Sequence, residues 1–256
     1  MAGKGQRVDG YLVVGGLYHD LDFARLELLK LLNEDERLRI RVGEDYSDTD
    51  TIGKSDFLVT FTVDVLPTPE QQALLRDYVA DGGRWFALHG TNSIIEWTPE
   101  GKVDAPRSAP DFMRLLGSQF IAHPPIMEFE VKPSAADHPL VQGIDAFRTS
   151  DELYLSELHD PDEVLLHCHY NGKAQQGFVE EEWFSDEPRP VMYLKRTGQG
   201  EVLYLTLGHC RGKWDMQPLI EEYPAIERCS WETPEYRELL RRGIRWAARL
   251  DEREAA

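Results

Sequence analysis

Cysteine is scarce in this sequence: Cys168, Cys210 and Cys229 are the only three among its 256 residues. They are too few for a disulfide framework and too scattered for the paired ligands of a zinc knuckle. We therefore expect reduced thiols. Cys210 stands beside His209, but a buried thiol is more often inert packing than a nucleophile, so we expect no thiol chemistry there.

Positive charge and long apolar runs are also lacking. The chain has 28 lysine and arginine residues against 46 aspartate and glutamate residues, which leaves a formal net charge of −18. That excess disfavours binding to phosphate backbones or to anionic lipid. No stretch approaches the ~20 apolar residues of a membrane span, and no apolar signal segment precedes the first strand-like run. We expect a cytoplasmic protein that has neither nucleic acid nor a membrane surface as its partner.

Several catalytic signatures are missing as well. The segment "VVGGLYHDLDFA" lacks the glycine spacing of the GxGxxG dinucleotide fingerprint, and no Walker-type lysine loop or HExxH motif occurs. The Gly-x-Ser-x-Gly elbow of the α/β-hydrolases is absent too. These gaps weigh against nucleotide-binding proteins, zincins and serine hydrolases.

The sequence does contain an alternation of strand-like and helical segments. The run Tyr11–Leu17 is apolar and glycine-containing, which is typical of a strand buried on both faces, and a helical pattern with Asp20 as its N-cap follows. The alternation continues with strands at Arg39–Val42, Asp56–Val63 and 84–89 and a helix within 68–83. This order predicts a doubly wound α/β fold, whose ligands bind at the carboxyl ends of its parallel strands.

The second half of the chain is less regular. Residues 96–110 are rich in proline, glycine and charge, and a long loop of this kind is often a functional lid or rim. Helices are predicted at 110–116 and 233–250, and short strands at Ile126–Lys132, Glu152–Leu158, Val164–His169, Pro190–Lys195 and Glu201–Leu207. No break in composition and no internal repeat divides the chain, so we predict a single domain over 1–256 with its core at about 11–250.

Four of the eight histidines follow apolar runs or adjoin glycines: His19, His89, His123 and His209. If the strands are parallel, His19 and His89 emerge at the same edge of the sheet, with Asp64 beside them. Imidazoles gathered there can act as general acid and base or bind a metal. Singly, each histidine is more often a hydrogen-bonded turn residue, and it is the four together that indicate a site.

Two other clusters have competing interpretations. Asp151 and Glu152, in "RTSDELYLSEL", can cap a turn or supply an acid or a metal ligand. His167 and His169 alternate along one strand and would share a face, but we expect them to be structural or at the edge of a site.

Tryptophans at 97, 183, 214 and 231 lie in loop-like stretches, where they can stack on a sugar or be part of the core.

A series of short motifs resembles a known family. In order along the chain these are "HD" after the first strand, "GGRWFALHG", "LLGSQFIAHP", "DHPLVQGI", "DELY", "GQGEVLYLTLGH" and "GIRWAA". Together, from Tyr11 to Leu250, they resemble the ThuA-like proteins, the trehalose-utilisation family. The resemblance implies the fold of the class I glutamine amidotransferases, a flavodoxin-like three-layer sandwich with a mostly parallel sheet.

The strand ending at His89 departs from the amidotransferase pattern. An amidotransferase presents its nucleophile on a strained Gly-x-Cys-x-Gly elbow, whereas the corresponding residues here are Ala87-Leu88-His89-Gly90-Thr91. Covalent acyl transfer needs the thiol, so we do not expect glutamine amidotransferase activity despite the fold.

For function, the resemblance implies carbohydrate catabolism, with trehalose and related glycosides oxidised to ketones by partner dehydrogenases. We therefore expect an enzyme that acts on a 3-keto-glycoside. A ketone acidifies the neighbouring C–H bond, so a base that removes this proton permits elimination, hydrolysis or isomerisation without a covalent nucleophile. His89 or His19 would be that base, and Asp151 or Glu152 would orient an imidazole.

The resemblance and the histidine positions together define the expected site. The expected catalytic residues are His19, His89, His123, Asp151 and Glu152, the expected substrate-binding residues are Asn92, Gln119, Asp64 and Trp214, and the expected metal ligands are His19, His123 and His209. The cofactor would be a divalent ion, Zn²⁺, Mn²⁺ or Ni²⁺, that stabilises an enolate.

Two other functions fit the same sequence. One is a non-catalytic sugar- or protein-binding module on an amidotransferase-like scaffold, and the other is a metal-dependent amide or ester hydrolase. The elbow carries Gly90-Thr91 where alanines are common in the family, and the 96–110 insertion can reshape specificity, so the sugar need not be trehalose. We expect a small carbohydrate as the ligand and a homo-oligomer as the assembly.

Overall fold

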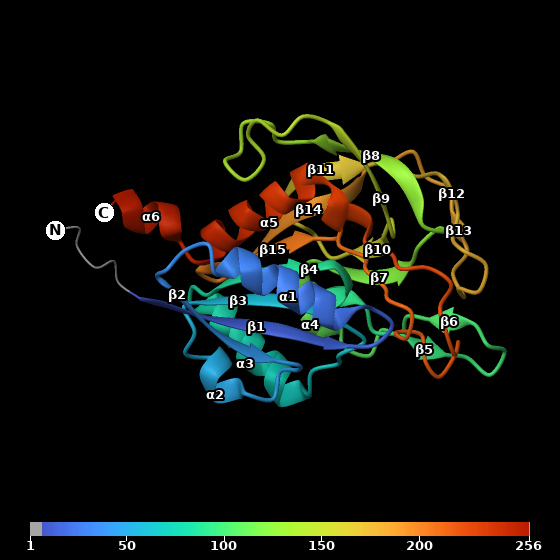
Figure 1. Ribbon diagram of the computed structural model, residues 1–256, viewed down its shortest axis with the longest axis horizontal. Coiled ribbons are helices and arrows are strands. Elements are labelled where there is room, and N and C mark those ends of the chain that lie inside the picture. Colours follow the sequence, from blue (N-terminus) through green and yellow to red (C-terminus); the bar gives the residue numbers. More distant parts are fainter. Residues whose placement is uncertain (1–6, 256) are drawn as a thin grey trace.

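One large sheet runs through the computed structural model, which describes residues 7–255 (Figure 1). The first six residues and the last residue of the predicted domain lie outside that range. Among the described residues the sheet has the order β2-β1-β3-β4-β15-β14-β11-β8-β9. Its first five strands are mutually parallel: β2 (Leu38–Gly43), β1 (Val8–Gly16), β3 (Phe57–Val63), β4 (Arg84–Leu88) and β15 (Gly200–Leu205).

The other side of the sheet is an antiparallel extension. It comprises β14 (Arg189–Thr197), β11 (Glu163–Cys168), β8 (Met127–Pro133) and β9 (Phe147–Asp151). The predicted strand Glu152–Leu158 is wrong at its start, because β9 ends at Asp151 and a separate strand, β10 (Leu155–Leu158), pairs with β7 (Ser118–Ala122). Residues 152–154 therefore leave the sheet and are free to serve the site.

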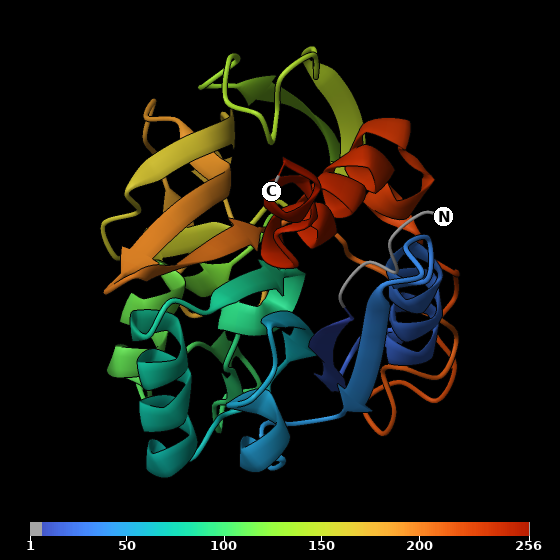
Figure 2. The ribbon, with the colours of Figure 1, turned by 90° about the vertical axis from the view of Figure 1, so that its left-hand side faces the viewer.

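Helices cover both faces of the parallel half. The helices of the described residues are α1 (Leu21–Leu32), α2 (Thr49–Ile52), α3 (Pro69–Ala80), α4 (Pro110–Leu116), α5 (Pro234–Ala247) and α6 (Leu250–Ala255), of which α6 lies beyond the end of the sheet next to α5 (Figure 1). Successive side chains of β1 point to opposite faces, so Leu12 packs in the core beneath α1 and α5 while Val13 packs in the core beneath α3 and α4. Figure 2 shows α3 in teal on one side of the strands and α1 in blue and α5 in red on the other. The predicted α/β sandwich is confirmed.

The helix boundaries follow from local capping. Asp20 accepts a hydrogen bond from the Phe23 amide at the start of α1 (3.0 Å), as predicted. Thr68 and Gln71 form a capping box at the start of α3. Among residues 7–255, no helix combines the length and the apolar character needed to cross a membrane.

Short hairpins and 3₁₀ turns surround the carboxyl ends of the parallel strands. The predicted loop 96–110 contains the hairpin β5 (Glu96–Trp97) and β6 (Val103–Asp104), and a second hairpin joins β12 (Gly172–Lys173) to β13 (Glu182–Trp183). The 3₁₀ turns η1 (His89–Asn92) and η2 (Cys229–Glu232) complete this edge. The residues that follow the parallel strands therefore lie close together at this edge, and the hairpins partly enclose them.

Candidate active site

His89 occupies a strained position directly after β4. Its φ is 45°, a left-handed conformation that is uncommon for a residue other than glycine and is frequent at functional sites. Gly90 permits the tight turn, because a Cβ there would lie 2.5 Å from Val63 Cγ2 and 2.9 Å from the Thr62 carbonyl oxygen. The elbow geometry of the fold is therefore present, with an imidazole where an amidotransferase has a thiol.

Asp151 fixes the turn that carries His209. Its carboxylate accepts hydrogen bonds from the amides of Gly208 (3.0 Å) and His209 (3.1 Å) and from the Ser230 hydroxyl. Burial raises the pKa of Asp151, although the two backbone donors act in the opposite direction. Asp151 is thus a positioning residue that holds His209 in place, rather than a group that faces a ligand.

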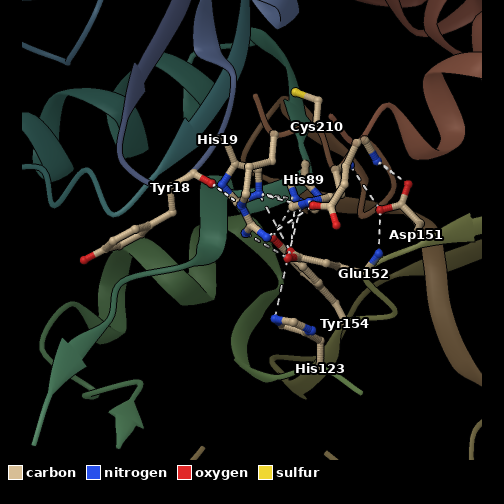
Figure 3. A network of polar contacts seen from close by, with 12 residues as sticks. Tyr18, His19, His89, His123, Asp151, Glu152, Tyr154 and Cys210 are labelled. Atoms are coloured by element: carbon tan, nitrogen blue, oxygen red, sulfur yellow. Dashed lines mark hydrogen bonds and ion pairs between the residues drawn. The ribbon is translucent and has the colours of Figure 1, made fainter. Parts of the chain in front are cut away.

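Three imidazoles and one carboxylate converge above the sheet edge: His19, His89, His209 and Glu152, the imidazole cluster (Figure 3). His19 Nε2 lies 2.9 Å from His89 Nε2 and 3.0 Å from His209 Nδ1. Glu152 reaches His209 Nδ1 at 3.1 Å and His89 Nε2 at 3.5 Å. None of the four is more than 6% exposed. The residues come from four separate parts of the chain and meet only in the fold.

The outer nitrogen of each imidazole faces an atom that can only accept a hydrogen bond. These contacts are His89 Nδ1 with the Thr206 carbonyl (2.9 Å), His209 Nε2 with Glu227 Oε2 (2.9 Å) and His19 Nδ1 with the Leu17 carbonyl (3.3 Å). The outer nitrogens must therefore donate, which leaves the inner nitrogens of neutral rings with lone pairs that point at one another. Lone pairs in this arrangement need a proton or a cation between them, and the outer contacts are typical of metal-binding histidines.

When no metal ion is bound, a proton lies within the imidazole cluster, and the pKa values of its members indicate which ring carries it. Burial lowers the pKa of His19 to about 3, so this imidazole is neutral. Burial also acts to lower the pKa of His209, but the carboxylates of Glu152 and Glu227 raise it to about 9. Burial opposes ionisation of Glu152, yet the protonated His209 beside it holds the pKa of this carboxyl well below its usual range. A proton on His209 thus balances the buried carboxylate of Glu152.

The imidazole cluster fits a divalent metal ion. Its four ligand atoms all lie within 4.8 Å of one another, and ligands of one tetrahedral ion are about 3.3 Å apart when each bond is about 2.0 Å. Imidazole nitrogens with one carboxylate suit Zn²⁺, Mn²⁺ or Ni²⁺. Compared with the predicted ligands, His19 and His209 are in the cluster, whereas His123 lies outside it and His89 and Glu152 take part.

A cavity of about 530 Å³ opens over the cluster, and His19, Glu152 and His123 line it. His123 donates from Nδ1 to the Pro124 carbonyl (2.7 Å), so its Nε2 carries a lone pair, 3.6 Å from Glu152 Oε1. Figure 3 shows His123 on the opposite side of Glu152 from His19 and His89. Burial lowers the pKa of His123. The ring is a neutral base that faces the cavity.

Three further residues at the site were not predicted from the sequence. The Tyr154 hydroxyl lies 3.1 Å from His89 Nε2, and burial raises its pKa well above the usual value. Arg211 reaches Glu152 Oε1 (3.5 Å) and Glu227 Oε2 (3.3 Å). Tyr154 is part of the "DELY" motif, which could have indicated it, but no motif marks Arg211 or Glu227.

The four predicted substrate-binding residues lie outside the set that lines this cavity. Asn92 donates to Ser118 Oγ (2.7 Å), Gln119 to the carbonyls of Ala105 and Pro106 (both 3.1 Å), Asp64 accepts from the Ile95 amide (3.0 Å), and Trp214 is 59% exposed. The first three brace the walls behind the cavity. A direct contact between any of the four and a substrate stays a prediction.

The sequence profile of the ThuA family, described as trehalose utilisation, matches residues 12–221. The chain belongs to the ThuA family. Among curated proteins, none matches the chain in sequence.

Solved structures agree with this assignment at the level of the fold. A ThuA-like protein from Parabacteroides merdae ATCC 43184 aligns with a TM-score of 0.68 and 16% identity, covering 95% of this chain and 90% of its own. A ThuA-like protein from Bacteroides uniformis ATCC 8492 gives 0.67 and 17%, covering 96% and 94%. A Thermoplasma acidophilum protein described as part of a GMP synthase gives 0.50 and 12%, covering 98% and 99%. The ThuA fold of this chain is thus a flavodoxin-like, amidotransferase-like sandwich, as predicted.

Proposed function

We propose that this ThuA-family protein is an enzyme of carbohydrate catabolism that acts on a 3-keto-glycoside by acid–base chemistry, with a divalent metal ion in the imidazole cluster. The observation that carries the proposal is the convergence of three inner nitrogens, from His19, His89 and His209, on Glu152 at the floor of the cavity. A ThuA protein of this kind would consume the product of a dehydrogenase that oxidises a sugar hydroxyl.

In this proposal the cluster holds the metal, and the acceptors behind it keep each ring in the tautomer that binds. Glu227 is the acceptor for His209, and the Thr206 carbonyl is the acceptor for His89. A bound divalent ion would supply Lewis acidity to the ketone oxygen of the substrate. The strained backbone at His89 keeps its ring over the end of β4, where the ligands of such folds bind.

The acid and base are residues of the chain. The sequence predicts His89 or His19 as the base, but in this proposal their inner nitrogens hold the metal, so His123 takes that role. His123 Nε2 takes the proton from C2, next to the C3 ketone, and the C–H electron pair becomes the enolate. The C1–O bond then breaks, and the departing oxygen receives a proton from the Tyr154 hydroxyl, which is protonated because burial raises its pKa. The product is an unsaturated ketone that water can add to. No covalent enzyme intermediate is needed, in keeping with the absence of a thiol at the elbow.

The test is turnover of methyl 3-keto-β-D-glucoside in the presence of Zn²⁺, Mn²⁺ or Ni²⁺. His123→Gln and Tyr154→Phe should each lower kcat/KM by about 100-fold or more. His169→Gln is the matched control, since this exposed ring follows β11 in the antiparallel extension. Unchanged rates in both site variants would contradict the assigned acid and base, and a wild-type protein inactive with all three metals would contradict the enzyme.

A metal-dependent hydrolase of amides or esters is the second candidate. The donor set of the cluster favours it, because three histidines and a carboxylate also suit a hydrolytic metal centre. Hydrolysis of 4-nitrophenyl acetate that depends on added metal and on Glu152, with no turnover of the keto-glycoside, would select this alternative.

We also propose a cytoplasmic location. All three cysteines are free, and burial raises the pKa of the Cys210 thiol well above its usual value, which favours the reduced, unreactive form. Fractionation of the producing cells, with a periplasmic marker as the control, tests it.

A further inference from the structure

Away from the imidazole cluster, the wall of the cavity changes from polar to apolar. The apolar side chains of this wall are Ile95, Trp97, Val103, Ile126, Phe178, Met216 and Ile220. Resting on the proposed function, we propose that the substrate is a 3-keto-glycoside whose aglycone is an apolar, aromatic or alkyl alcohol, and that a second sugar is disfavoured.

The two ends of the cavity differ in how far their side chains are exposed to solvent. His19, Glu152 and Tyr154 are 4–6% exposed and form its floor, whereas Trp97 is 46% and Ile220 is 40% exposed and form its mouth. The reacting keto-sugar must meet the floor, because the base, the acid and the metal ligands are there. The group attached to C1 through the glycosidic oxygen therefore extends toward the mouth, between apolar side chains.

The aromatic residues at this wall are held in position. The Trp97 indole N–H donates to the Tyr18 hydroxyl (3.2 Å), so the indole offers its apolar faces rather than a free donor. Phe178 packs edge-on against His123, with 5.0 Å between ring centroids. An apolar wall thus runs from the proposed base outward, which is the setting that an aromatic ring prefers.

Polar partners for a second sugar are few in the outer part of the cavity. Tyr223 and Arg211 line it, but both are already engaged with Glu227. The remaining side-chain donors are two hydroxyls and two amides. The Tyr18 hydroxyl already accepts from the Trp97 indole, and Ser93 is buried. The amides of Gln175 and Gln176 are exposed to solvent. A pyranose in this place would lose water from several hydroxyls without replacing those hydrogen bonds, whereas an apolar aglycone would gain from burial.

The test compares benzyl and methyl 3-keto-glucosides, in both anomers, with 3-keto-trehalose. Benzyl and methyl alkoxides are leaving groups of similar basicity, so a difference in kcat/KM reports contact with the aglycone. We expect kcat/KM for the benzyl compound to exceed that for the methyl compound and for 3-keto-trehalose by about tenfold or more.

Variants assign the preference to the wall. Trp97→Ala and Ile220→Ser should each reduce the benzyl-to-methyl ratio of kcat/KM at least about threefold, whereas Phe184→Ala, an exposed aromatic outside this cavity, should leave the ratio unchanged. Equal turnover of benzyl and methyl compounds, or a preference for 3-keto-trehalose, would overturn the inference and leave the proposed function standing. No turnover of any of the three would overturn the proposed function and the inference with it.

Discussion

Asp151 and Glu152 are adjacent in the chain, yet both act on His209, one through its backbone and the other through its ring. Asp151 accepts from the His209 amide at 3.1 Å, and Glu152 Oε1 lies 3.1 Å from His209 Nδ1. The break between β9 and β10 makes this possible, because consecutive residues outside a regular strand need not alternate between opposite faces. The pair divides into a positioning carboxylate and a site carboxylate.

The first prediction concerns Asp151→Asn. An amide in this place presents its own N–H groups where Asp151 now only accepts from the amides of Gly208 and His209. We expect the free energy of unfolding to fall by about 1–3 kcal/mol and metal affinity to fall with it, measured by urea unfolding and by calorimetry. Asp145→Asn, at an exposed carboxylate, is the control. A variant as stable as the wild type would contradict the positioning role.

The second prediction concerns metal content. After dialysis against a chelator and then against Zn²⁺, Mn²⁺ or Ni²⁺, the protein should retain about one equivalent of ion. His89→Asn should lose this ion, since it removes an inner nitrogen 2.9 Å from His19 Nε2. His167→Asn, which removes a ring that contacts Ser134 instead, should retain it. Elemental analysis showing less than about a tenth of an equivalent for every metal would rule the centre out.

The sequence predicts the parallel half of the fold well, because parallel strands that are buried on both faces have unbroken apolar sequences, with helical segments between them. Every residue of β3 is buried, and β4 ends where the polar residues begin. From that order alone His19 and His89 were expected at one edge, and the structure places their rings 4.9 Å apart. The ThuA motifs supplied the layer arrangement that the runs could not.

The composition of the cluster was harder to predict, because it depends on contacts between distant segments. His123 follows β7, which pairs with β10 rather than joining the large sheet. Its ring therefore does not follow a strand of that sheet, and it contacts the cluster only through Glu152. Arg211 and Glu227 belong to an irregular segment after β15, which has no periodicity to place its side chains. Tyr154 falls in the predicted strand Glu152–Leu158, but in the structure it lies between β9 and β10, outside both strands.

The third prediction concerns Glu227→Gln. Glu227 accepts from His209 Nε2 (2.9 Å) without belonging to the ligand set, so it fixes the tautomer and raises the basicity of Nδ1. We expect the variant to bind metal about 10–100-fold more weakly. Its free energy of unfolding should fall less than that of His89→Asn, which removes a member of the imidazole cluster. Glu222→Gln, at a carboxylate that pairs with Lys213 on the surface, is the control. Equal affinities for wild type and Glu227→Gln would show that the contact does not tune the ligand.

The last prediction concerns the pH dependence of stability when a chelator keeps the protein free of metal. The pKa of His209 is raised from 6.5 to about 9, so between these values the native state keeps a proton that the unfolded chain releases. The contribution of His209 is therefore full below pH 6.5 and is lost as the pH rises toward 9. The pKa of His19 is lowered to about 3, so its contribution is present above pH 6.5 and is lost as the pH falls.

Each histidine should add a slope of about 1.4 kcal/mol per pH unit to the free energy of unfolding within its own window. Urea unfolding across the pH range measures both slopes. His209→Asn should remove the alkaline loss, and His19→Asn should make the acid loss less steep, because the lowered pKa values of His123 and Glu152 account for the rest of it. His169→Asn, at an exposed ring, should change neither. A His209→Asn protein that still loses stability as steeply above pH 6.5 would show that the raised pKa of His209 is not the cause, because the only group removed is the imidazole that Glu152 and Glu227 keep protonated.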